Sequence, residues 1–123
     1  MKNNKHHPLI KSIRFALSGI VKVIRNERNM KIHLFAALLV TFFGLIVGIN
    51  KLEWLVLILL FFVMFAVETV NSSIETICNL LVEKLHLNYE ETKEIRNISA
   101  GASMLIAIGA VIIGIVIFLP YFL

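Results

Sequence analysis

The sequence contains no aspartate and a single cysteine, and it has few charged residues of either sign. All eight acidic residues are glutamate, so any acidic site must be built from that residue. Cys78 on its own excludes an intrachain disulfide and a multi-cysteine metal site, and its apolar neighbours predict a buried free thiol. Only 16% of the 123 residues are charged, whereas 59% are hydrophobic. These proportions exclude an ordinary soluble domain and predict one compact membrane protein.

The six glycines stand apart from one another, at positions 19, 44, 48, 101, 109 and 114. Phosphate-binding loops of soluble nucleotide-binding folds need several glycines close together, so the sequence excludes such a fold. Two pairs of small residues are spaced four apart, Gly44 with Gly48 and Ala110 with Gly114, as in helices that pack closely in a membrane. Because three helices alone enclose little space, we expect the protein to assemble as an oligomer.

A basic arm, residues 1–31, carries eight of the twelve basic residues against one acid, Glu27. Between Leu9 and Ile24 apolar residues recur at three- and four-residue steps, and basic or polar residues fill the other side. This pattern predicts an amphipathic helix that begins near Pro8 and lies on an anionic membrane surface. The interleaved apolar residues argue against nucleic acid as a partner. A signal peptide is disfavoured because no small-residue cleavage pattern follows Val47.

Three apolar runs follow the arm, at about 32–49, 52–81 and 98–119. The first is broken only by His33 and Thr41, and at about 1.5 Å per residue it spans roughly 27 Å, enough to cross a bilayer. We interpret His33, at headgroup level, as an interfacial hydrogen-bonding residue rather than a metal ligand. A tight hairpin at Asn50 and a polar loop over 82–97 connect the runs.

The sequence therefore predicts an all-α membrane protein with two parts: the surface-helix arm, 1–31, and a three-helix transmembrane domain, 32–123. Basic residues concentrate in the arm and in the polar loop. Because basic segments stay in the cytoplasm, we expect the amino terminus inside and the carboxyl terminus outside a bacterial inner membrane.

Four polar side chains recur along the second run, and they are Glu68, Asn71, Glu75 and Asn79. Steps of three, four and four residues put them on one face of a helix. Ionisable groups at membrane depth are costly and usually face a cavity or a partner helix. The predicted topology brings Glu68 to the inner leaflet and Glu75 near the water, with Glu27 at the same level.

Two interpretations of this stripe are open on spacing alone. One is phosphoryl transfer, in which Glu27 and Glu75 bind Mg²⁺ and the deeper Glu68 acts as the base. The other is that the same groups hydrogen-bond neighbouring helices or form a proton or ion path.

The octapeptide ETVNSSIE, from Glu68 to Glu75, resembles the signature of the small bacterial integral-membrane diacylglycerol kinase and undecaprenol kinase family. The similarity extends to residues 25–29, to three spans in the same order and to residues 99–102. It implies a homotrimer whose composite sites, at the inner membrane face, transfer the γ-phosphate of MgATP to a lipid alcohol. Undecaprenol is favoured and diacylglycerol is next. The implied roles are Glu68 as base, Asn71 as its polar support, Glu27 and Glu75 as Mg²⁺ ligands, and Phe15, Arg96 and Asn97 as nucleotide contacts.

The chain departs from the family pattern where Asn79 and Asn97 replace aspartate and Arg96 replaces lysine. A different register matches residues 93–94 to the family pair. If the last helix begins early, Glu94 shares a face with Asn97 and partly restores the lost acid. Asn97 or Ser99 could instead cap that helix. These departures leave a second function open, that of a weakly active or inactive family member which binds lipid or nucleotide as a membrane assembly protein.

Overall fold

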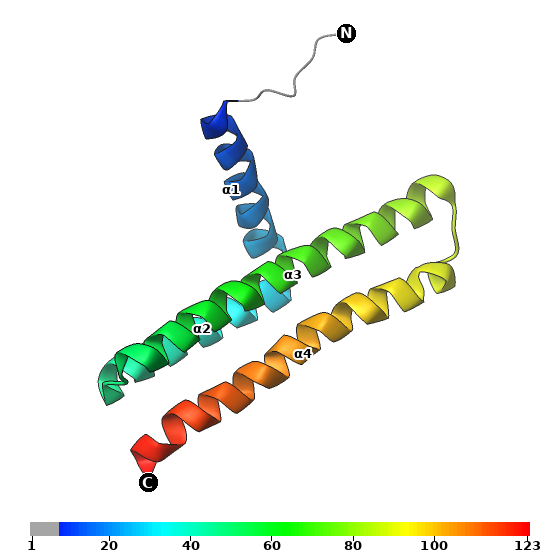
Figure 1. The fold of residues 1–123 in the computed structure, drawn as a ribbon. Helices are drawn as coiled ribbons and strands as arrows, with labels where there is room; N and C mark the ends of the chain where they lie inside the picture. The colour runs from blue at the N-terminus through cyan, green and yellow to red at the C-terminus, as the bar shows by residue number, and fades with distance from the viewer. Residues whose placement is uncertain (1–7) are drawn as a thin grey trace.

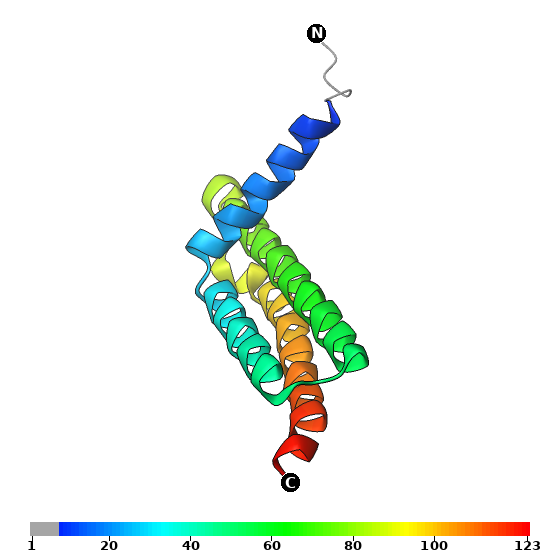
Figure 2. The same cartoon turned by 90° about the vertical axis from the view of Figure 1, so that its left-hand side faces the viewer.

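The computed structural model describes residues 8–123, and in that part of the chain every regular element is a helix (Figure 1). The four helices are α1 (Leu9–Asn26), α2 (Arg28–Val47), α3 (Lys51–Leu85) and α4 (Tyr89–Phe122). The last three are long and apolar enough to cross a membrane. They lie side by side, while α1 turns away from them (Figure 2). The prediction of an all-α chain with one separate helix and three spans is confirmed; Lys2 and Lys5 of the arm lie outside the described residues.

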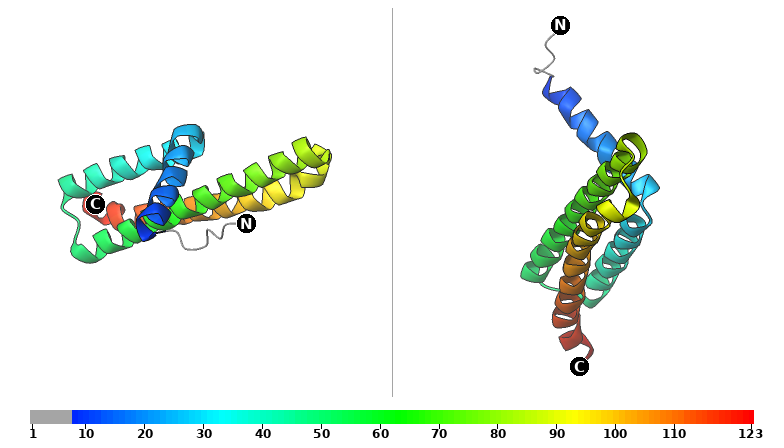
Figure 3. Two further views of the ribbon diagram at one scale, coloured as in Figure 1. Left: turned by 90° about the horizontal axis from the view of Figure 1, so that it is seen from above. Right: turned by 90° about the vertical axis from the view of Figure 1, so that its right-hand side faces the viewer.

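A single residue separates α1 from α2. Glu27 has extended backbone angles, φ −101° and ψ 120°, and it caps the end of α1 and the start of α2. Its N–H donates to the carbonyl of Val23, and its own carbonyl accepts from the N–H of Lys31. We call this residue the elbow. It turns the chain sharply, so that α1 leaves the bundle at an angle instead of continuing α2 (Figure 3).

The hairpin between α2 and α3 depends on two glycines and a capping box. Gly48 adopts the left-handed conformation, φ 77°, which a residue without Cβ reaches at no steric cost. Asn50 and Glu53 then exchange hydrogen bonds across the first turn of α3. One turn earlier, a Cβ on Gly44 would lie 2.8 Å from the ring of Trp54. Gly44 therefore allows close approach of two helices, as the small-residue spacing predicted.

The predicted polar loop over 82–97 is wrong. Helix α3 continues to Leu85 and ends where His86 turns left-handed, φ 60°. Asn88 caps α4 in a capping box with Glu91, so α4 begins at Tyr89. The polar residues that suggested a loop form the ends of two helices, which extend past the start of α2 (Figure 3). Hydropathy marks where the apolar part of a helix ends, whereas the end of the helix itself depends on caps and left-handed residues.

This early start also corrects the caps proposed at Asn97 and Ser99, since both residues lie inside α4. Glu94 and Asn97 now stand three apart on one helix, as the alternative register required. At the other end, Pro120 lies within the last turns of α4 and does not end it.

Few side chains are buried within one chain. A small core joins the hairpin to α4 through Ile49, Leu57, Leu60 and Ile117. Cys78 is buried and free, as predicted. Most large apolar side chains of α2, α3 and α4 are exposed, as expected of helices that face lipid or other membrane helices.

Candidate active site

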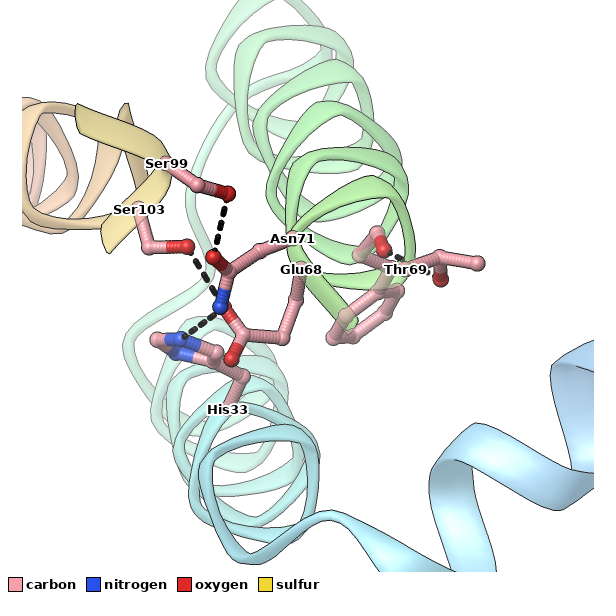
Figure 4. A network of polar contacts seen from close by, with 7 residues as sticks. His33, Glu68, Thr69, Asn71, Ser99 and Ser103 are labelled. Carbon is pink, nitrogen blue, oxygen red and sulfur yellow. Dashed lines mark hydrogen bonds and ion pairs between the residues drawn. The ribbon is translucent and has the colours of Figure 1, made fainter. Parts of the chain in front are cut away.

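Glu68 lies where three helices meet, and its side chain is almost completely buried, with 2% of the residue exposed. Its Oε2 accepts a hydrogen bond of 2.7 Å from the hydroxyl of Ser103 on α4. Nε2 of His33 on α2 lies 3.9 Å from the same oxygen (Figure 4). A buried carboxylate without partners would be strongly destabilising. The contacts therefore explain how this acid is retained inside the bundle.

Asn71 follows one turn later on α3 and is buried as well. Its Oδ1 accepts a hydrogen bond of 2.5 Å from the hydroxyl of Ser99. Ser99 and Ser103 are four residues apart on α4, and Glu68 and Asn71 are three apart on α3, so both pairs follow one helix face. Two parallel hydrogen bonds thus fix the register of α3 against α4 at the site (Figure 4).

A second feature is a groove of about 370 Å³ between α1 and α3. The residues that line it are Gly19, Lys22, Val23, Asn26, Glu27, Ser72, Ser73, Thr76 and Ile77. The elbow, Glu27, is half-buried there, and its Oε1 accepts a hydrogen bond of 3.1 Å from the hydroxyl of Ser72. One amine, one carboxylate, an amide and three hydroxyls therefore face a single open groove, a set of groups suited to phosphate and its counter-ion.

The other predicted site residues occupy different positions. Glu75 is half-buried on α3, three residues past Ser72. Phe15 is exposed on α1, one turn before the groove residue Gly19. Among residues 8–123, no cluster of three or more His, Cys, Asp or Glu side chains suits a metal ion. A cation bound by Glu27 and Glu75 would therefore need further ligands other than His, Cys, Asp or Glu side chains of this part of the chain.

Arg96 is held on its own helix. Its Nε donates a hydrogen bond of 3.0 Å to Thr92, and its guanidinium lies 4.7 Å from the centre of the Tyr89 ring. Asn97, the next residue, is exposed. Neither residue lines the groove between α1 and α3.

We call Glu68 and Asn71 the buried pair. Sequence reasoning missed the partners of these two residues. His33 was interpreted as an interfacial residue, Ser99 as a cap, and Ser103 was not considered. A signal was present, because two serines four apart in an apolar span can hydrogen-bond a neighbouring membrane helix. The groove residue Lys22 was treated as part of the lipid-facing arm, since nothing in its spacing separates the two roles.

Comparison with known proteins agrees with this arrangement. The family model described as prokaryotic diacylglycerol kinase matches residues 14–118. Undecaprenol kinase of Bacillus subtilis is 35% identical over 117 residues, which cover 95% of this chain and 93% of that protein. Diacylglycerol kinase of Synechocystis is 30% identical over 112 residues, which cover 91% of this chain and 63% of that protein. No solved structure matches the chain.

The family match spans most of the chain, including all residues of the buried pair and of the groove. Three apolar helices make the protein a multi-pass membrane protein. The chain therefore belongs to the prokaryotic diacylglycerol kinase family, and it is a membrane lipid kinase.

Proposed function

We propose that the protein transfers the γ-phosphate of ATP to the hydroxyl of a membrane lipid alcohol at the cytoplasmic face of a bacterial inner membrane. The observation that carries the proposal is Glu68, a buried carboxylate held at the junction of three apolar helices. Undecaprenol is the favoured acceptor, because the relative that matches over 93% of its own length is an undecaprenol kinase. Diacylglycerol is the second choice.

In this proposal Glu68 is the general base and Asn71 supports it. The lipid hydroxyl gives its proton to the Glu68 carboxylate while its oxygen forms a bond to the γ-phosphorus. The bond from that phosphorus to the oxygen shared with the β-phosphate breaks, and ADP leaves. Such a transfer needs positioning and charge neutralisation more than covalent chemistry from the protein.

The groove between α1 and α3 is the proposed ATP site. The amine of Lys22 and the hydroxyls of Ser73 and Thr76 are suited to phosphate oxygens. Phe15, exposed one turn before the groove, offers a ring for the base. This groove shares Glu27 with the predicted metal site, so the phosphates would lie beside that site.

Glu27 and Glu75 are the proposed Mg²⁺ ligands. Mg²⁺ binds one or two carboxylates and completes its shell with phosphate and water oxygens, so two half-buried glutamates fit its chemistry. When bound, the ion neutralises phosphate charge. The protein's own part is to hold Glu27 in place, which the hydroxyl of Ser72 does at 3.1 Å.

Arg96 and Asn97 are proposed nucleotide contacts as well. Because neither lines the groove of its own chain, we assign this contact to the interface between protomers of a homotrimer. Thr92 and Tyr89 hold the guanidinium of Arg96 in place, which lowers the entropy lost when it binds phosphate.

The test is phosphate transfer by the purified protein in lipid vesicles with labelled ATP, Mg²⁺ and either undecaprenol or diacylglycerol. We expect labelled lipid from the wild type and a loss of at least about 1,000-fold in Glu68→Gln. Thr69→Val is the matched control, because the Thr69 hydroxyl donates to the carbonyl of Phe65 in its own helix and points away from the network (Figure 4). Nucleotide binding without transfer to either lipid would refute the proposal and favour the non-catalytic assembly protein.

A further inference from the structure

Two serines of α4 each hydrogen-bond one member of the buried pair: Ser103 contacts Glu68 and Ser99 contacts Asn71. Ser103 donates to Oε2 of Glu68, and Nε2 of His33 faces that same oxygen at 3.9 Å. Both of these contacts involve Oε2, and neither involves the second carboxylate oxygen, Oε1. A carboxylate that is held by one oxygen keeps the other as an acceptor.

Asn71 is held in the complementary way. Its carbonyl oxygen, Oδ1, accepts from the hydroxyl of Ser99 at 2.5 Å. The amide nitrogen, Nδ2, lies on the other side of the same planar group and takes no part in that hydrogen bond. The amide therefore offers two N–H donors and has its acceptor engaged.

We propose that Ser99 and Ser103 are positioning residues that set which atoms of the buried pair face the substrate. They engage Oδ1 of Asn71 and Oε2 of Glu68, so that Nδ2 is the donor and Oε1 the acceptor assigned to the substrate. A neutral alcohol needs this combination, since its proton must go to an acceptor while its oxygen accepts from a donor during attack. The proposal rests on the proposed function and specifies the substrate group at this site as an un-ionised hydroxyl.

The hydrogen bond from the Ser99 hydroxyl to the side-chain carbonyl of Asn71 determines which amide atom faces the substrate. If Ser99 were absent, the amide could rotate by half a turn and present its oxygen instead. Two acceptors would then face the alcohol, which has one proton to donate. Without Ser103, the carboxylate of Glu68 would lose one charge-assisted hydrogen bond. Such bonds are stronger than hydrogen bonds between neutral groups.

Substitutions at Ser103 test the proposal, because threonine and valine have nearly the same shape but only threonine has a hydroxyl. The measurement is kcat and KM for the lipid alcohol in vesicles at saturating MgATP, with Thr69→Val as control. We expect Ser103→Val to lower kcat roughly 10-fold to 100-fold, as for loss of one charge-assisted hydrogen bond. KM for the lipid should change less than about twofold, since the bond acts on the reacting atoms. Ser103→Thr should restore kcat to within about threefold of wild type.

A purely structural role for Ser103 predicts a different result. Both variants would then be impaired to the same extent, or both would match the wild type, and either outcome would overturn the inference. Ser99→Ala provides a second measurement, with an expected fall in kcat of about 10-fold; wild-type turnover would contradict the role assigned to Asn71. If the wild type transfers no phosphate, the proposed function itself fails, which separates the two conclusions.

Discussion

The close contact between Gly44 and Trp54 predicts how much a substitution of Gly44 changes the free energy of unfolding. A Cβ placed on Gly44 would lie 2.8 Å from Cη2 and 3.1 Å from Cζ2 of the Trp54 ring, and 3.2 Å from the end of Ile49. Atoms at such distances repel, so the ring or one of the helices must move. Overpacking of this kind costs about 1–3 kcal/mol. Alanine also gains about 0.5–1 kcal/mol of helix propensity over glycine.

The net expectation for Gly44→Ala is a loss of roughly 1–2 kcal/mol in the free energy of unfolding. Gly109→Ala is the matched control, because a Cβ on Gly109 meets no atom within 4 Å. That substitution should raise the free energy of unfolding by about 0.5–1 kcal/mol through propensity alone. The comparison thus separates helix propensity from packing.

Both variants can be measured in mixed micelles with a rising fraction of a denaturing detergent. Trp54 is the only tryptophan of the chain, so its fluorescence reports on the contact as well as on unfolding. Protein concentration must be held constant, because an oligomer gains stability with concentration. Equal stabilisation of Gly44→Ala and Gly109→Ala, with an unchanged Trp54 emission spectrum, would refute the packing argument.

Three further predictions concern the groove and the polar ends of α3 and α4. Glu27→Gln keeps the shape of the side chain but removes its charge, so KM for MgATP should rise at least about 10-fold while KM for the lipid stays within about twofold in vesicle assays. Glu91→Ala removes the carboxylate that accepts from the N–H of Asn88 at the start of α4, a contact worth about 1 kcal/mol, and should speed hydrogen exchange at the amides there about fivefold. Asn97→Asp should raise turnover by supplying an acid near the proposed phosphate site, as measured with saturating lipid and MgATP.

Each of these three predictions would be contradicted by a specific result. An unchanged KM for MgATP in Glu27→Gln would remove Glu27 from the metal site. Unchanged exchange in Glu91→Ala would mean that packing of α4, and not its cap, sets the stability of that end. An unchanged rate in Asn97→Asp would indicate that Glu94, three residues earlier on α4, already provides the acid.

Periodicity was sufficient to locate the buried pair but not its partners. The spacing of Glu68 and Asn71 put both on one face of a helix, and the structure buries both. Their partners lie far away in the chain, with His33 and Ser103 each 35 residues from Glu68. Which residues meet across two helices depends on the rotation and register of both helices. A repeat within one segment carries no information on that relation.

The lower half of the stripe shows the same limit. Glu75 is half-buried and Asn79 is exposed, although both follow the spacing of Glu68. Helix α3 extends past the start of α2 there, so the same face has one neighbour fewer (Figures 1 and 3). Spacing defines a face, and burial requires a neighbouring element against that face.

The elbow at Glu27 has a mechanical consequence. Two helices are joined there by one extended residue, so their relative orientation is set mainly by the two backbone dihedrals of Glu27. In the topology predicted from the sequence, the headgroup surface holds one arm of this joint, α1, and the bilayer interior holds the other, α2. A thinner bilayer makes a spanning helix tilt more. A change in the tilt of α2 relative to α1 must change the backbone angles of Glu27, whose carboxylate faces the groove. The thickness of the surrounding membrane is thereby linked to the position of a charge at the proposed ATP site.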